Sequence, residues 1–101
     1  MKAPQSIGTM AALRAEIDAL DARIVAALAA RARLIDRAAE LKPAEGMPAL
    51  VPARVEQVIA RVRAAAQAEG LDPELAEGLW RQIIEWSVAR EEAVLGKGEG
   101  A

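Results

Sequence analysis

A four-three repeat in the first half of the chain constrains the fold more than any other feature. The repeat begins at Leu13 and ends at Leu41, just before Lys42 meets Pro43. Its positions hold Leu13, Ile17, Leu20, Ile24, Ala27, Arg31, Leu34, Ala38 and Leu41. This spacing is typical of a coiled-coil-like seam and covers about eight helical turns. A helix of that length in a chain of 101 residues cannot pack along its whole length against a core of its own. We therefore expect it to need a partner.

Two shorter helices are expected after the long one. The segment 43–52 reads PAEGMPALVP and must be a loop, because it contains three prolines and a glycine. The residues expected at the helix boundaries are Thr9, Lys42, Pro52, Gly70, Asp72 and Gly96. No segment alternates with period two for long enough to form a strand. The sequence therefore predicts an all-α fold with three helices per chain and a long first helix.

The residue types that the chain lacks exclude several kinds of active site. Its 101 residues include no His, Cys, Tyr or Phe. A Ser-His-Asp triad, a Cys nucleophile, a His base and a zinc site of Cys or His ligands are therefore excluded, as are disulfides. We expect neither a metal nor a cofactor. The net charge of -2 argues against a basic surface for nucleic acid or acidic membranes.

The small size of the side chains predicts association between copies. Ala fills 25 of the 101 positions and two Trp are the only aromatic residues. Alanine favours helices but buries little apolar area, so we expect the core to be completed in a homodimer. The longest apolar run, 24–30, is far shorter than the roughly 20 residues of a membrane span. We expect a cytoplasmic protein with one domain over residues 1–101, in which 1–8 and 96–101 are flexible tails.

Two cations on the first helix are candidates for binding an anion. Arg31 occupies a seam position, where it either reaches outward to solvent or is held inside to bind an anion. Lys42 follows eleven residues later, which places it about 20° away around the helix and roughly 16 Å along it. Arg14 lies about 100° off that face and some 25 Å away, so it could serve only the pocket of a dimer partner.

The third helix also carries polar residues on an otherwise apolar stripe. Ser87 and Glu91 lie one turn apart between Ile84 and Val94, so both are expected to face a cavity. The alternative is that the helix end frays and Glu91 pairs with a neighbouring arginine in water. Arg54 adds a cation where the second helix begins. Several cations with one hydroxyl and one carboxyl suit a small dianion, bound either as a substrate or by a regulatory sensor for an anionic metabolite.

Over roughly residues 8–95 the chain resembles the all-α, AroQ-type chorismate mutase superfamily. The resemblance is carried by LRAEIDALDARIVAALAARARLIDRAAELK, by PARVEQV and by GLDPELAEGLWRQIIEWSVAREEAVL, together with the order of helices and loop. Members are intertwined homodimers in which the long first helices pair and each of two active sites draws residues from both chains. The resemblance implies the same intertwined dimer here, and the rearrangement of chorismate to prephenate.

The resemblance also implies roles for individual residues. The matching substrate-binding positions are Arg14, Arg31, Lys42, Arg54, Val55, Ser87 and Glu91. Arg14 of the partner chain and Arg31 would hold the two carboxylates of the substrate. Lys42 would contact a carboxylate and the ether oxygen that gains negative charge as the C–O bond breaks, and Glu91 would donate a second hydrogen bond to that oxygen. Arg54 would close and orient the bound ligand, and the pocket would hold a reactive conformer.

Two departures from the family pattern leave the reaction open. Many mutases have Gln at the position of Glu91, and only a protonated carboxyl can donate the hydrogen bond, so we expect activity to fall as Glu91 ionises. Typical mutases also place Glu after the loop arginine to hold the substrate hydroxyl, whereas Val55 follows Arg54 here.

The second departure makes a sister reaction the main alternative. An Arg-Val pair at this point, and the stretch EGLWRQIIEWSVA, resemble the related isochorismate-pyruvate lyases, which produce salicylate and pyruvate. Ser87 fits the mutase pattern better, so chorismate mutase is our first prediction. A further alternative is a non-catalytic helical dimer that binds an anionic metabolite or a partner protein.

Overall fold

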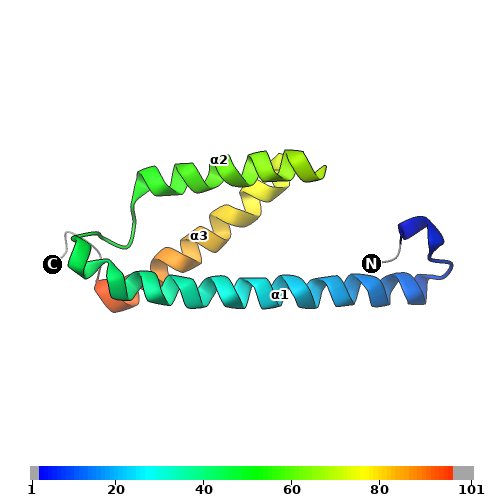
Figure 1. Cartoon of the computed structure of the whole chain (residues 1–101), viewed down its shortest axis with the longest axis horizontal. Coiled ribbons are helices and arrows are strands. Elements are labelled where there is room, and N and C mark those ends of the chain that lie inside the picture. The colour runs from blue at the N-terminus through cyan, green and yellow to red at the C-terminus, as the bar shows by residue number, and fades with distance from the viewer. Residues whose placement is uncertain (1–2, 97–101) are drawn as a thin grey trace. The chain divides into compact units, whose positions relative to one another are not determined.

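The computed structural model describes residues 3–96, and helices make up most of that length (Figure 1). The elements, in order, are a 3-10 turn (Pro4–Ser6), α1 (Met10–Leu41), a second 3-10 turn (Pro43–Glu45), α2 (Pro52–Glu69) and α3 (Pro73–Leu95). Residues 3–96 include no strand. The predicted all-α class with a long first helix is confirmed.

The predicted helix boundaries are also confirmed, and the local chemistry explains them. At the start of α1, the Ala12 N–H donates to Oγ1 of Thr9 at 3.1 Å. At the end of α2, Gly70 adopts φ 74°, a left-handed conformation that favours glycine, and its N–H donates to helix carbonyls. At the start of α3, Oδ1 of Asp72 accepts from the Glu74 N–H at 2.9 Å. Each of the two N-cap side chains contributes about 1 kcal/mol.

The two 3-10 turns are features that the sequence analysis did not foresee. Residues 4–6 form one turn, and the Ser6 hydroxyl donates to the Ala3 carbonyl at 2.8 Å. The second turn, 43–45, occupies the first part of the expected loop. The flexibility expected of residues 3–8 and of Gly96 stays a prediction, and the rest of the expected tails, residues 1–2 and 97–101, lies outside the described residues.

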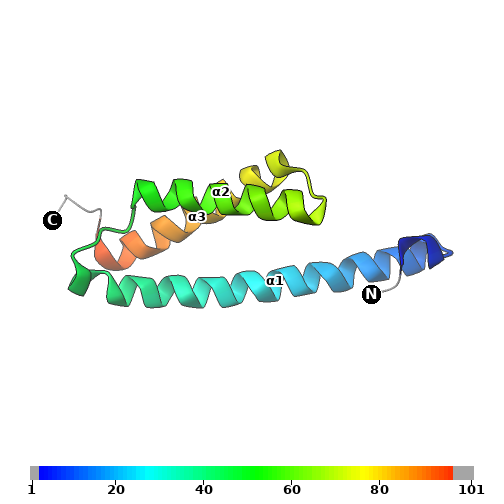
Figure 2. The ribbon, with the colours of Figure 1, turned by 45° about the horizontal axis from the view of Figure 1, so that its top comes forward.

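The described chain divides into two units, 3–33 and 34–96, and α1 runs through the boundary between them. In the second unit α2 and α3 lie side by side in both views (Figures 1 and 2). The apolar side chains spaced along one face of α2 are buried or half-buried, with Ile59 and Ala66 most enclosed. The face consists of Val55, Val58, Ile59, Val62 and Ala66. Ala76 and Ile84 of α3 are also buried, and with Ala39 and Ala49 they complete the small set of buried apolar residues in this unit.

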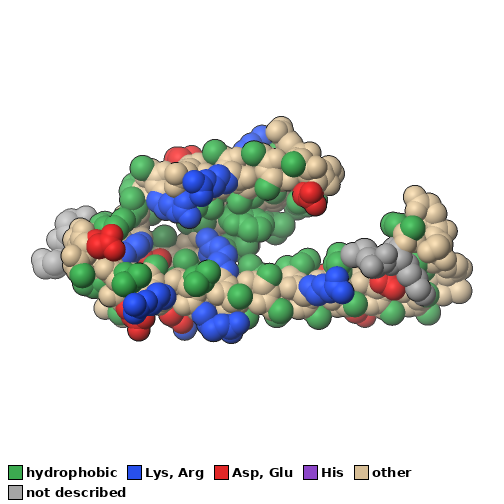
Figure 3. Space-filling view, in the orientation of Figure 1, with side chains coloured by type: hydrophobic (Ala, Val, Ile, Leu, Met, Phe, Trp, Pro, Cys, Tyr) green, Lys and Arg blue, Asp and Glu red, His purple; other side chains and the backbone are tan. Residues whose placement is uncertain are grey.

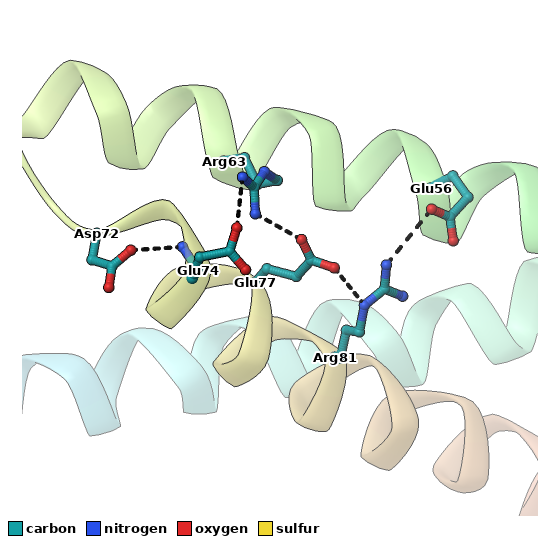
Figure 4. Close-up of polar contacts among 6 residues, drawn as sticks. All are labelled: Glu56, Arg63, Asp72, Glu74, Glu77 and Arg81. Atoms are coloured by element: carbon teal, nitrogen blue, oxygen red, sulfur yellow. Dashed lines mark hydrogen bonds and ion pairs between the residues drawn. The ribbon is translucent and has the colours of Figure 1, made fainter.

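A network of partly exposed charged side chains joins α2 to α3 in addition to that core (Figure 4). Arg63 on α2 contacts Glu74 at 3.0 Å and Glu77 at 2.9 Å. Arg81 on α3 binds Glu77 at 2.8 Å and reaches Glu56 of α2 at 3.7 Å. Because these side chains reach solvent, each pair adds little stability, and the network supplements the apolar core between α2 and α3.

The first unit consists mainly of the N-terminal part of α1, whose apolar seam remains uncovered within the chain. Ile17, Leu20 and Ile24 are 50%, 38% and 52% exposed. Figure 3 shows apolar side chains along the visible surface of α1. This exposure agrees with the expected need for a partner, although the homodimer itself stays a prediction. Within residues 3–96, no helix has both the length and the apolar character that crossing a membrane requires.

Candidate active site

A buried ion pair between Lys42 and Glu91 is the centre of the candidate site. Lys42 directly follows α1, Glu91 lies in the last two turns of α3, and Nζ of Lys42 is 2.7 Å from Oε1 of Glu91. Their side chains are 16% and 5% exposed. The structure therefore brings together two residues 49 positions apart in the sequence. The alternative of a frayed helix end, with Glu91 paired to an arginine in water, is wrong.

The carboxylate of Glu91 is only partly satisfied by this contact. Oε1 is close to the ammonium but accepts no well-aligned hydrogen bond within residues 3–96. A buried polar atom without a hydrogen bond costs about 1–3 kcal/mol. A bound ligand could lower that cost, by accepting a hydrogen bond from the protonated carboxyl group or by donating one to the carboxylate.

The loop after α1 encloses Lys42 from the other side. The Lys42 ammonium donates to the backbone carbonyl of Ala49 at 2.8 Å. The Lys42 carbonyl accepts from the N–H groups of Glu45 and Met47 at 3.1 and 3.0 Å. Gly46, at φ 68°, supplies the left-handed residue that this reversal needs. Both the backbone and the side chain of Lys42 therefore hold the loop.

Ser87 lies one turn before Glu91 and is also buried, with 3% of its surface exposed. Its hydroxyl donates to the Ile83 carbonyl of the preceding turn at 2.8 Å. Ser87 and Glu91 are therefore both buried on one face of α3, and the expectation that this face lines a cavity stays a prediction. Val94, the next residue of the predicted stripe, is 70% exposed, so the enclosed part of the stripe ends at Glu91.

The remaining predicted site residues lie on α1 and at the start of α2. Arg54 is exposed on the first turn of α2, where its guanidinium donates to Gln57 at 2.7 Å, and Val55 beside it is half-buried. Arg14 and Arg31 lie on α1 in the first unit, where Arg14 is exposed and Arg31 is half-buried. The roles of these four residues stay predictions.

An ion pair that the sequence analysis missed clamps α3 next to Glu91. Arg90 donates to both oxygens of Asp36 on α1, at 2.7 and 3.0 Å. The hydrogen bond from Arg90 holds the pKa of Asp36 below its ordinary value, against a smaller opposing effect of desolvation. Arg90 also lies 5.5 Å from the centre of the Trp86 ring. The sequence carried no signal for this clamp, because 54 residues separate its two partners.

Comparison with known proteins identifies the family to which this arrangement belongs. The sequence profile described as chorismate mutase type II matches residues 13–92. The chain belongs to the chorismate mutase type II family. The matched segment includes the end of α1, the loop and α3 as far as Glu92, and therefore both members of the Lys42–Glu91 pair.

Three relatives illustrate the range of reactions within this family. The chain is 36% identical to the isochorismate pyruvate lyase of Pseudomonas aeruginosa over 92 aligned residues. The alignment covers 90% of the chain and 89% of that protein. The chain is 32% identical over 87 residues to the 4-amino-4-deoxychorismate mutase of Streptomyces pristinaespiralis, covering 86% and 67%. It is 33% identical over 85 residues to the T-protein of Enterobacter agglomerans, covering 84% of the chain but 23% of that protein. The chain thus spans about a quarter of the T-protein's length.

Proposed function

We propose that this chain is a chorismate mutase that converts chorismate to prephenate. The observation that carries the proposal is the buried Lys42–Glu91 pair, a cation and a carboxyl group enclosed together at the end of α3. The rearrangement breaks a C–O bond and forms a C–C bond in one pericyclic step. It requires no nucleophile, base or metal. A chain without His or Cys can therefore catalyse it, provided that its pocket fixes the substrate and stabilises the developing charge.

Lys42 is the group best placed to stabilise that charge. Negative charge grows on the ether oxygen as the C–O bond breaks, and a buried ammonium stabilises it more strongly than one in water because the surroundings screen it less. Glu91 in its protonated form would donate a second hydrogen bond to the same oxygen. When Glu91 is ionised it can only accept, and it then competes with the substrate for Lys42.

The substrate is a dicarboxylate, and we propose that arginines bind its two carboxylates. Arg31 of one chain and Arg14 of its partner would form charge-assisted hydrogen bonds to them, while Arg54 would close over the ligand and Ser87 would line the pocket. This arrangement requires an intertwined homodimer with shared active sites. We also propose that residues 1–101 form one such domain, which the family match over 13–92 supports.

The homodimer can be tested through the exposed seam of α1. Ile24 is a seam residue that is 52% exposed within one chain. In sedimentation experiments, Ile24→Glu should therefore convert the dimer to monomers, and it should abolish turnover. Ala22→Glu introduces the same charge at an exposed position off the seam and is the matched control. A dimer that persists in Ile24→Glu would contradict pairing through this seam.

The second candidate function is isochorismate-pyruvate lyase. It is favoured by the 36% identity to the Pseudomonas aeruginosa lyase over 89% of that protein, and by Val55 after Arg54. The lyase reaction also begins with C–O cleavage and needs the same cations, so the buried pair serves either reaction.

Product analysis separates these candidates. Purified chain is offered chorismate and isochorismate separately, and the products are identified. Prephenate from chorismate supports the mutase, whereas salicylate and pyruvate from isochorismate with no prephenate would favour the lyase. A folded dimer that converts neither substrate would overturn the enzymatic proposal and leave the non-catalytic binder.

A further inference from the structure

We propose that the backbone carbonyl of Ala49 is a positioning group for the reaction, because it anchors the Lys42 ammonium without neutralising its charge. This inference rests on the proposed function and assigns a task to the loop between α1 and α2. The contact that carries it is the 2.8 Å hydrogen bond from Nζ of Lys42 to the Ala49 carbonyl.

The anchor is firmly built into the loop. Ala49 is 4% exposed, although its neighbours Met47 and Leu50 are 40% and 48% exposed. The preceding residue, Pro48, has a ring that restricts its backbone rotation. The N–H groups of Glu45 and Met47 bond back to the Lys42 carbonyl at 3.1 and 3.0 Å. The loop therefore closes on Lys42 through its backbone and returns to the side chain of the same residue at Ala49.

The chemical difference between the two partners of Lys42 explains why such an anchor is useful. A lysine side chain is flexible, and holding its ammonium in one place costs rotamer entropy. An ionised Glu91 would hold it but would also cancel its charge. A carbonyl is neutral, so it fixes the ammonium and leaves the full positive charge for the ether oxygen of the substrate.

The three N–H groups of the Lys42 ammonium have different partners. An ammonium group has three N–H donors. Within residues 3–96, the Ala49 carbonyl takes one and Glu91 faces a second, which leaves a third for the substrate. The loop continues directly into α2, where Arg54 and Val55 occupy the first turn. The Lys42–Ala49 contact therefore couples the position of the catalytic cation to the start of α2.

The test weakens this one acceptor without changing a side chain. The Ala49–Leu50 peptide bond is replaced by an ester in the full-length chain, because an ester carbonyl is a poorer acceptor than an amide carbonyl. The chain can be synthesised from segments that are ligated at a cysteine, which is then desulfurised to alanine. Its 25 Ala offer ligation sites, and it has no Cys of its own that desulfurisation would alter. The matched control places the ester one bond later, between Leu50 and Val51, where it alters a carbonyl that does not bind Lys42.

The expected result is a fall in kcat/KM of about three- to tenfold for the first ester, mainly in kcat, and less than about twofold for the control. A second readout does not depend on activity. The chain has only three lysines, Lys2, Lys42 and Lys97, so the ¹⁵Nζ spectrum is sparse. We expect an exchange-protected ammonium signal that is absent in Lys42→Arg, lost in the first ester and kept in the control.

Equal kinetics and equal ammonium spectra for the two esters would overturn the inference while leaving the proposed function intact. A kinetic loss without any change in the ammonium signal would also overturn it, because the loop would then act through its shape alone. If the unmodified chain converts neither chorismate nor isochorismate, the proposed function fails, and the positioning role falls with it.

Discussion

Replacing Glu91 by Gln tests the chemistry of the buried pair most sharply. Gln keeps the volume of the side chain and an acceptor oxygen for Lys42, and its amide donates at every pH. Wild-type activity should fall about tenfold per pH unit once Glu91 has ionised, because only the protonated carboxyl donates to the ether oxygen. The Glu91→Gln variant should keep a flat profile over the same range and exceed the wild type at its alkaline end.

The substitution should also affect stability, by an amount that the geometry bounds. Nζ and Oε1 are 2.7 Å apart, with side chains 16% and 5% exposed, so Lys42 loses a closely placed counter-charge. Breaking a buried pair outright costs about 3–5 kcal/mol, but Gln still offers an oxygen, so we expect about 1–3 kcal/mol. For a domain of about 100 residues, each 1 kcal/mol shifts Tm by about 4–8 °C.

The assay combines steady-state chorismate turnover across pH with thermal unfolding at neutral pH. Glu92→Gln removes the neighbouring, half-buried carboxylate and is the matched control, expected to keep the wild-type profile. Identical pH profiles for wild type and Glu91→Gln would refute the role of Glu91 as a proton-bearing donor. An unchanged Tm in Glu91→Gln would refute the energetic importance of the pair.

The remaining predictions concern three other positions. Arg31→Ala should lower kcat/KM at least about a hundredfold with an unchanged helical circular dichroism spectrum, because charge-assisted bonds to a substrate carboxylate are lost; retained activity would remove Arg31 from the site. Val55→Glu should raise the ratio of chorismate to isochorismate turnover, measured as kcat/KM for each, because it restores a partner for the substrate hydroxyl. Hydrogen bonds from Arg81 and Arg63 hold the pKa of Glu77 below its ordinary value. Ionised Glu77 therefore stabilises the fold at pH values above the ordinary pKa of a glutamate. This stabilisation is lost as the pH falls through the lowered pKa of Glu77 in the folded chain. Glu77→Gln should therefore unfold at a slightly lower temperature than wild type near neutral pH, and the difference should vanish in acid.

The helical layout could be predicted because its signals are local. Thr9, Gly70 and Asp72 each satisfy or terminate backbone hydrogen bonding within a few residues, and prolines mark the ends of the loop. The spacing of apolar residues along α2, which matches its buried face, is a local signal of the same kind. These signals depend on neighbours within about one helical turn, which a single sequence displays directly.

The contacts within the site could be predicted only in part. Spacing indicated that Ser87 and Glu91 share a face, but it could not show that Lys42 would meet Glu91 rather than an arginine in water. The Asp36–Arg90 clamp gave no sequence signal because its two residues are far apart in the sequence. The Ala49 carbonyl gave none because every residue type carries a backbone carbonyl. These contacts depend on how α1, the loop and α3 pack.

The measurement that tests the account most directly is chorismate turnover by the purified chain beside its Lys42→Ala variant. The account predicts that the wild type forms prephenate and that Lys42→Ala, still helical, is slower by about a hundredfold or more, because the developing charge loses its nearest cation. A folded wild-type chain that forms no prephenate, or a Lys42→Ala variant that forms it at the wild-type rate, would contradict the account.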